Sequence, residues 1–510
     1  MKRIFLAIFL ISGFFFYVSA QQSEWVSDST AVNSFLDRQD ILFEDYSVAL
    51  GDAYYDYYSG VLSDYGKLEE IKGRTFVEKD SMESVIRFWI PKVTEIKDTM
   101  LIRRLIQWHG ILAASMVNNI PEIRNLQSEL EKWLVASDTV KGKPSSKKLE
   151  EMAIELLSKR NGSARAIGFP GYSELVLTVN GIQPEKLHYW LDEIDTLTIE
   201  PYRMMVEEMK EKNGIDEVGI QDVFRIYFNF FQCGSPEPPK EERQAILSST
   251  LNGLGMKYED LPILHREMML PPPMGGQGIA VRIPDNFKLV VNPSVGLSTI
   301  FHEVGHGLAC VYTQISSPVL KGYEWVAGGT SPIMAEGLAE WSAGILLTPE
   351  WMKKYTALTD NEIAEKSAAY KKYSPVNIRF WLYNVWLELE IFNNPGLDVD
   401  SLRTQLLKRY LLVDKPSSRP YEIANSMFVS YPIYNHNYLF AEVIKWQIHN
   451  ELRKRLGNDY LFNPQTAALM QEYFYKDGEY YQWQEKLKRF TGKGLDTEGY
   501  VKWCKDEIAK

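Results

Sequence analysis

Apolar residues recur every three or four positions along most of this 510-residue chain, which is the spacing of one face of an α-helix. The pattern predicts helices over residues 81–118 (interrupted at Pro91), 147–160, 183–212, 361–392 and 438–456. Neither an internal repeat nor a Gly/Ser-rich linker divides this pattern into independent units. We therefore expect a mainly α fold built as one large body.

Strand signals are rare by comparison, and the clearest pair lies just past the middle of the chain. Residues 278–283 and 287–291 are rich in β-branched and other apolar residues, and the turn-forming residues 284–286 separate them. We expect two short paired strands here. An aromatic segment that contains Tyr54, Tyr55, Tyr57 and Tyr58 is interpreted as the packing face of a helix rather than as a substrate-facing rim.

The first 20 residues differ from the rest. Lys2 and Arg3 precede an apolar run from Ile4 to Val18, and small residues stand at Val18 and Ala20. This layout is typical of a secretory signal peptide cleaved before Gln21, and we favour it over a retained membrane anchor. The prediction is a secreted or periplasmic protein whose residues 21–510 form a single catalytic domain without a membrane segment after cleavage.

Composition narrows the function classes only slightly. The hydrophobic fraction of 45% and the charged fraction of 24% are those of an ordinary globular protein. A formal net charge of −11 argues against a nucleic-acid-binding protein, which would carry a basic excess. The three cysteines are odd in number and far apart, so we expect no disulfide framework.

The candidate chemistry begins at His302-Glu303-Val304-Gly305-His306. Two histidines four residues apart on a helix project from the same face, so both imidazoles can reach one ion. Zinc suits such ligands and leaves a position open for water. Glu303 lies about 100° around the helix and is placed to accept a proton rather than to bind the metal. Ser298 is expected to cap this helix.

A third ligand is available in the segment from Ser331 to Trp341. The four-residue spacing of Glu336 and Glu340 places both carboxylates on one helix face. We predict that Glu336 binds the metal and that Glu340 orients a ligand histidine through its other ring nitrogen. The alternative, a solvated acidic face, is less favoured because most of the neighbouring residues are apolar.

These motifs resemble those of gluzincin metallopeptidases of the angiotensin-converting enzyme and thimet oligopeptidase type. Residues 329–340 are similar to the pattern Gly-x-x-Pro-x-x-x-Glu-x-x-x-Asp of the converting enzymes, with Glu340 in place of the Asp. The segment that begins at Tyr438 resembles a Tyr-Leu-Trp-x-Glu-Val stretch of the oligopeptidases. The resemblance is patchy and runs from about residue 150 to 450.

The resemblance implies a large two-lobed helical metallopeptidase with a deep substrate channel and a small β-sheet beside the zinc helix. It implies that Tyr438 donates a hydrogen bond to the oxyanion of the tetrahedral intermediate, a role that suits a neutral phenol. It also implies a substrate-binding histidine before this tyrosine, for which His436, with Tyr434 beside it, is the nearest candidate.

The sequence therefore predicts a monomeric zinc enzyme that cleaves short peptides, as a peptidyl-dipeptidase or an oligopeptidase does. Two alternatives stay open. One is a secreted aminopeptidase or another gluzincin hydrolase, although the aminopeptidase motif Gly-x-Met-Glu-Asn is absent from the chain. The other is an inactive protein that binds zinc or peptides, against which Glu303 and Tyr438 argue.

Overall fold

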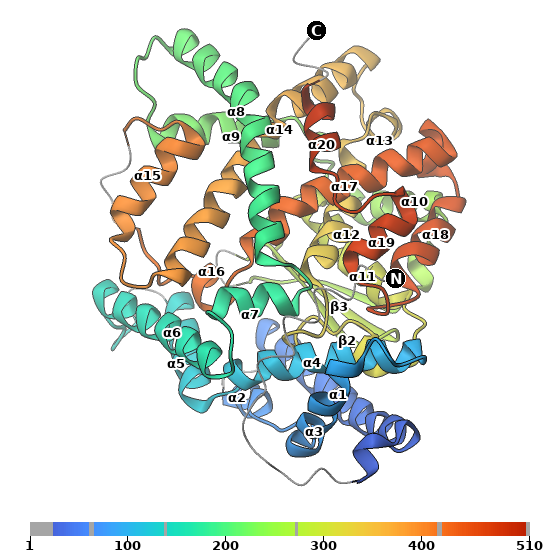
Figure 1. Ribbon diagram of the computed structural model, residues 1–510. Helices are drawn as coiled ribbons and strands as arrows, with labels where there is room; N and C mark the ends of the chain where they lie inside the picture. Colours follow the sequence, from blue (N-terminus) through green and yellow to red (C-terminus); the bar gives the residue numbers. More distant parts are fainter. Residues whose placement is uncertain (1–23, 61–65, 137–139, 271–273, 416–420, 506–510) are drawn as a thin grey trace.

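The computed structural model describes residues 24–60, 66–136, 140–270, 274–415 and 421–505. These residues are mostly helical and include one small sheet, which confirms the predicted fold class (Figure 1). The predicted signal peptide, residues 1–20, lies outside the described residues. Among the described helices, none combines the length and the apolar character needed to cross a bilayer.

The first third of the chain forms a group of helices at one end of the molecule, the lower end in Figure 1. The predicted helical region 81–118 is broken near Pro91, where a short 3-10 turn (Ile90–Lys92) and a loop separate two helices. A proline in this position supplies no backbone N–H, so it ends the preceding helix. The helices of this group are α1 (Ser29–Tyr58), α2 (Gly66–Lys72), α3 (Lys79–Trp89), α4 (Thr99–Asn118), α5 (Pro121–Val135), α6 (Ser146–Ala166) and α7 (Tyr172–Val179).

Long helices make up the opposite end of the molecule. The predicted helices 183–212 and 361–392 are confirmed as α8 (Pro184–Asn213) and α14 (Asp360–Asn393). Each contains one buried proline in its interior, Pro201 in α8 and Pro375 in α14. Helices α9 (Ile220–Gln232), α13 (Pro349–Tyr355) and α15 (Val399–Leu411) pack on α14, whereas α10 (Arg243–Leu254) packs on α18 (Gln465–Met470).

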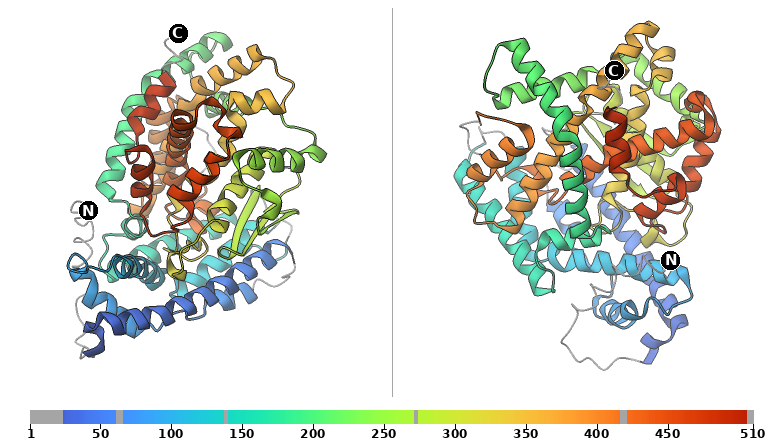
Figure 2. Two further views of the ribbon diagram at one scale, coloured as in Figure 1. Left: turned by 90° about the vertical axis from the view of Figure 1, so that its right-hand side faces the viewer. Right: turned by 45° about the horizontal axis from the view of Figure 1, so that its top comes forward.

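The sheet has three strands in the order β1-β3-β2. The two predicted strands are confirmed as β2 (Gly276–Arg282) and β3 (Asn286–Val291), which pair antiparallel. A third strand, β1 (Ile263–Glu267), pairs parallel to β3 and was not predicted, because its sequence has only two apolar residues. Strand β2 is an edge strand, and it packs on α1 and on the helix that follows the sheet (Figure 2).

Three helices of the second half of the chain meet beside this sheet. They are α11 (Leu297–Val311), α12 (Pro332–Gly344) and α17 (Asn435–Leu456), and α12 lies between the other two. Two glycines let α12 approach its neighbours. A Cβ at Gly305 of α11 would lie 2.7 Å from the Ala339 Cα, and one at Gly337 would lie 2.6 Å from an Ile444 side-chain atom of α17. The contacts leave no room for a larger residue at either position.

Three of the remaining helices pack on α17, and the fourth, α16, packs on α5 and α6. They are α16 (Ser426–Val429), α18 (Gln465–Met470), α19 (Trp483–Thr491) and α20 (Thr497–Lys505). All three cysteines, Cys233, Cys310 and Cys504, are free and buried, as expected from their number and spacing.

Candidate metal and catalytic site

Helix α11 carries the His-Glu-x-x-His motif and begins where a carboxylate meets its first backbone N–H. The Leu297 N–H donates to both carboxylate oxygens of Glu237, at 3.1 and 2.9 Å. A negative charge at a helix N-terminus is favourable because it satisfies a free donor and complements the helix dipole. The expectation that Ser298 caps this helix is wrong, since Ser298 lies inside the first turn.

Two ring nitrogens and one carboxylate oxygen converge between α11 and α12. The Glu336 Oε2 atom lies 3.4 Å from His302 Nε2 and 3.9 Å from His306 Nε2. One ligand atom from each of the three residues falls within 4.8 Å of the others. Tetrahedral zinc with bonds of about 2.0–2.2 Å places its ligand atoms about 3.4 Å apart, so the observed spacing is close to that of a metal site.

The hydrogen bonds of Glu336 fit a metal ligand as well. Its Oε1 atom accepts a hydrogen bond of 2.7 Å from the Tyr434 hydroxyl. Its Oε2 atom is buried and has no hydrogen-bond partner within the described part of the chain. An unpartnered buried carboxylate oxygen is costly unless a cation completes it. The residues present therefore fit the metal ion that the sequence predicts.

A second carboxylate holds each histidine by its other ring nitrogen. The His302 Nδ1 atom lies 3.2 Å from Glu340, and the His306 Nδ1 atom lies 3.3 Å from Glu324. Such contacts fix the ring orientation and leave Nε2 for a metal. Glu340 stands where the sequence predicted an orienting carboxylate. Glu324 was missed, because it lies in an irregular segment between α11 and α12 that carries no periodic signal.

Glu340 is itself held by a buried lysine. Lys445 of α17 lies 3.2 Å from Glu340 and 2.8 Å from Glu442. Burial disfavours the ammonium form, yet the neighbouring carboxylates raise the pKa of Lys445 well above its ordinary value. A continuous network of ionisable side chains thus connects His302, Glu340, Lys445 and Glu442. It joins α11, α12 and α17.

Glu303 lies beside the histidines and against the edge strand of the sheet. A Cβ at Gly276 would fall 2.8 Å from the Glu303 side chain, and one at Gly278 would fall 3.3 Å from its Oε2 atom. The two glycines of β2 therefore make the space that this carboxylate occupies. Burial raises the pKa of Glu303 above its ordinary value, which suits a group that must accept and return a proton.

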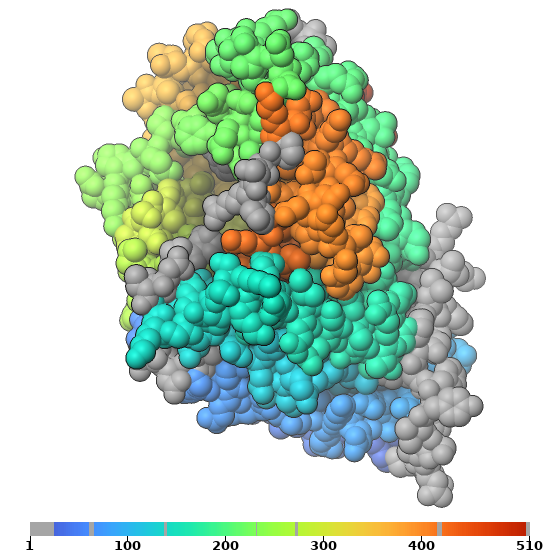
Figure 3. All heavy atoms as spheres, turned by 90° about the vertical axis from the view of Figure 1, so that its left-hand side faces the viewer, coloured from blue at the N-terminus to red at the C-terminus, as the bar shows by residue number. Residues whose placement is uncertain are grey.

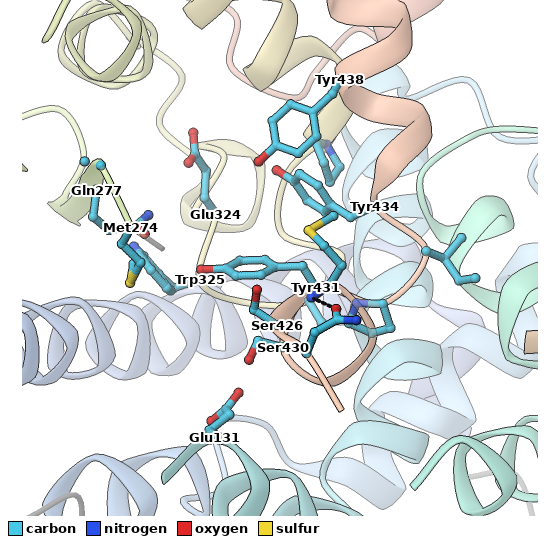
Figure 4. Close-up of a pocket in the computed structure, with 18 of the residues that line it drawn as sticks. Glu131, Met274, Gln277, Glu324, Trp325, Ser426, Ser430, Tyr431, Tyr434 and Tyr438 are labelled. Atoms are coloured by element: carbon cyan, nitrogen blue, oxygen red, sulfur yellow. Dashed lines mark hydrogen bonds between the residues drawn. The ribbon is translucent and has the colours of Figure 1, made fainter. Parts of the chain in front are cut away.

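Tyr434 and Tyr438 stand one turn apart at the start of α17, and the hydroxyl ends of both face Glu324 across the pocket (Figure 4). The Tyr438 ring stacks on Trp381 at 5.0 Å, and its hydroxyl makes no hydrogen bond within the residues that the structure describes. Burial raises the pKa of both phenols well above the ordinary value, so both remain neutral donors. The Tyr434 hydroxyl is already bonded to Glu336, whereas that of Tyr438 is available to a ligand.

The expectation for His436 needs correction. This residue is 1% exposed, its Nε2 atom is buried without a hydrogen-bond partner among the described residues, and it does not line the cavity. Positions 434 and 438 share one helix face because they are four residues apart, while position 436 lies about 200° around the helix. His436 is therefore on the buried side of α17 and cannot contact a substrate carbonyl.

The start of α17 is fixed by another buried carboxylate, which the sequence did not single out. Glu388 of α14 accepts hydrogen bonds from the backbone N–H groups of Tyr434 and Asn435, at 3.1 Å each, and from the Asn435 side chain at 2.9 Å. These are the free donors of a helix N-terminus. They attach the segment that carries both tyrosines to α14.

These side chains open into one large cavity of about 1560 Å³. It is lined by α1, α5 and α6 from the first third of the chain and by α11, α12 and α17 from the second half. Figure 3 shows the molecular surface hollowed between the yellow-green segment near the sheet and the orange helices. The volume exceeds the range of about 300–1,000 Å³ typical of small-molecule sites, so there is room for an oligopeptide.

Comparison with known proteins supports the fold. No protein-family model matches the chain, and no curated protein matches it in sequence. Solved structures do match over nearly their full length. PZ peptidase A, solved with an inhibitor, is 13% identical with a TM-score of 0.68, and the match covers 99% of this chain and 97% of that one.

Two further structures give the same result. An oligoendopeptidase F is 14% identical with a TM-score of 0.68, covering 100% of this chain and 96% of that one. A Pyrococcus furiosus carboxypeptidase is 13% identical with a TM-score of 0.62, covering 96% and 100%. At such identities the likeness shows that the chain shares the helical fold of these structures, and activity has to be argued from the site.

Proposed function

We propose that this protein is a zinc peptidase that hydrolyses short oligopeptides. The observation that carries the proposal is the convergence of His302 Nε2, His306 Nε2 and the unpartnered Glu336 Oε2 beside the buried Glu303, inside a cavity large enough for a peptide. The names of the similar structures, two peptidases and a carboxypeptidase, support the same reaction class.

His302, His306 and Glu336 would hold the metal. Zinc bound there would supply a Lewis acid that polarises a carbonyl and lowers the pKa of a water molecule. Glu303 accepts the proton of the attacking water and returns it to the leaving amine. The raised pKa of Glu303 favours the first transfer, because a carboxylate with a higher proton affinity accepts the proton of water more readily than an exposed glutamate does.

Tyr438 is the donor proposed for the oxyanion of the tetrahedral intermediate. Its phenol is neutral, its ring is fixed by stacking on Trp381, and its hydroxyl faces the pocket (Figure 4). A donor fixed before the reaction stabilises the developing charge without reorganisation. Tyr434 is proposed to orient Glu336, to which its hydroxyl is bonded, rather than to bind substrate directly.

The finer proposal is a peptidyl-dipeptidase or oligopeptidase of the gluzincin type, secreted or periplasmic, and monomeric. The motif around Glu336 and the predicted signal peptide support it. The edge strand β2 begins at the cavity, where Gly276 and Gln277 line the wall, so an extended peptide could pair with its backbone.

The test is Glu303→Gln. This change keeps the size of the side chain but removes the proton acceptor, so we expect peptide hydrolysis to fall by about 10²–10⁴-fold while zinc remains bound. Turnover of a mixture of short peptides would be followed by mass spectrometry, and zinc by elemental analysis. Glu151→Gln, an exposed position on α6 outside the cavity, is the matched control and should behave as the parent does.

The outcomes separate the alternatives. A Glu303→Gln protein as active as the parent would overturn the mechanism. A parent that binds zinc and peptides but cleaves none would identify the inactive binding protein instead. The product masses also distinguish release of C-terminal dipeptides from internal cleavage and from removal of N-terminal residues.

A further inference from the structure

Four aromatic side chains form one wall of the cavity. Tyr54, Tyr57 and Tyr58 come from the last turns of α1, and Trp325 comes from the segment between α11 and α12. The Tyr54 and Trp325 rings stack with centroids 4.0 Å apart, Tyr58 lies 6.1 Å from Tyr54 and 6.2 Å from Trp325, and Tyr57 lies 5.2 Å from Tyr58. We call these four residues the aromatic wall.

The sequence interpretation of this segment was only partly right. Tyr55 does pack into the core and is 7% exposed. The other three tyrosines are only partly buried, and they face the cavity. The helix therefore has two aromatic faces, one for packing and one that lines the site.

The aromatic wall lies next to the proposed metal site. Trp325 directly follows Glu324, whose carboxylate contacts His306. Consecutive Cα atoms are about 3.8 Å apart, so the wall begins within about one residue of a carboxylate that holds a proposed metal ligand. Figure 4 places Trp325 and Met274 on one side of the pocket, with Tyr431 nearby and Tyr434 and Tyr438 above them.

The wall is rigid on its outer side. Tyr58 and Trp325 pack against a small apolar cluster formed by Tyr55, Leu270 and three residues of the sheet (Ile279, Val281 and Val290). Tyr54 packs on the main core. Backed in this way, the rings are already in position to contact a ligand and lose little freedom on binding.

One polar atom of the wall has no partner. The Trp325 Nε1 atom is buried and makes no hydrogen bond within the described ranges of the chain. Buried indole N–H groups are usually bonded, so this donor lacks its usual partner. The proposal for the wall therefore rests on its ring faces, which line the cavity, and not on this N–H group.

We propose that the aromatic wall is the subsite for an aromatic or large aliphatic side chain of the peptide, at a residue next to the cleaved bond. The inference rests on the proposed function and specifies its substrate class. The side chain would stack on the rings of Tyr54, Tyr58 and Trp325, which line the cavity. Small and acidic residues would gain neither the stacking nor the buried apolar area.

The experiment uses a series of short alanine-based peptides in which one residue is Phe, Leu, Ala or Asp and is moved through every position. We expect the parent enzyme to cleave beside Phe or Leu with a kcat/KM at least about tenfold above that for Ala. Trp325→Ala should reduce this ratio to about threefold or less, and Trp325→Phe should retain most of it. Tyr189→Ala, an exposed position outside the cavity, should leave the ratio unchanged.

Three outcomes would overturn either the aromatic subsite or the proposed peptidase function. Cleavage of all peptides at one rate by the parent refutes the aromatic subsite but leaves the peptidase intact. An unchanged Phe-to-Ala ratio in Trp325→Ala does the same. A zinc-loaded parent that cleaves no peptide refutes the proposed function itself. If Trp325→Ala does not fold, Tyr54→Leu gives the same test, because it removes the ring that stacks on Trp325.

Discussion

At the scale of single residues, the site depends on a glycine as much as on its ligands. Gly305 lies between the two motif histidines, at the place where α11 touches α12. A Cβ there would be 2.7 Å from the Ala339 Cα and 2.9 Å from the Leu338 carbonyl oxygen, both backbone atoms that cannot move alone. Any larger residue must push the two helices apart, and Glu336 would then move away from both histidines.

Gly305→Ala should therefore weaken zinc binding and destabilise the fold. We expect an overpacking cost of about 1–3 kcal/mol and a lower zinc affinity, measured by thermal unfolding and by competition with a chelator. Gly162→Ala is the control, because a Cβ at this helical glycine of α6 meets nothing within 4 Å. It should stabilise the protein by about 0.5–1 kcal/mol. A Gly305→Ala protein that binds zinc as the parent does would contradict this account.

At the scale of elements, α17 supports the site from behind through Lys445. This helix places one buried ammonium between Glu340, which orients His302, and Glu442. Removing the lysine leaves two carboxylates without their cation in a buried position, which is far more costly than losing a surface ion pair. Glu340 would then take up a proton or move, and it would no longer hold His302.

Lys445→Met should lower the zinc affinity by about 10–100-fold, the usual effect of losing a partner of a ligand histidine. Chelator competition measures this directly, without relying on activity. Lys454→Met on the same helix is the matched control. Its side chain is 73% exposed and its ammonium pairs with Glu451 at 3.3 Å, so its loss should change zinc affinity and stability little. Equal effects of the two changes would show that the Lys445 network does not act on the metal site.

At the scale of the whole molecule, residues grouped by the spacing of a single helix could be predicted from the sequence. Contacts between distant segments could not. The spacing of His302 and His306, and that of Glu336 and Glu340, is a property of a single helix, so the sequence was sufficient to group them. Glu324 and Trp325 lie in an irregular segment, and Lys445 reaches Glu340 across 105 residues. Only the packing of α11, α12 and α17 brings such residues together. Strand β1 was not predicted because its sequence has only two apolar residues, and its pairing with β3 reaches across a loop and strand β2.

Buried histidines give the whole fold a predictable sensitivity to acid. Burial lowers the pKa of His109 to about 4 and the pKa values of His436 and His449 to about 3 each. In the unfolded chain these groups return to an ordinary pKa of about 6.5. The stability that each contributes is therefore fully present above about pH 6.5 and is lost as the pH falls toward its folded value.

His449 allows a direct test, because both of its ring nitrogens are engaged. Nε2 lies 3.0 Å from the Trp341 carbonyl oxygen of α12, and Nδ1 lies 2.5 Å from the Tyr460 hydroxyl, so the neutral ring is satisfied inside the core. His449→Gln removes this titration. The free energy of unfolding of the parent minus that of the variant should fall by about 1.4 kcal/mol for each pH unit below about 6, as measured by urea unfolding at several pH values. Proton uptake by the other histidines is common to both proteins and cancels in the difference. A difference that stays constant from about pH 7 to about pH 5 would mean that His449 is not held neutral, and the acid sensitivity would then have to come from the other buried histidines, His109 and His436.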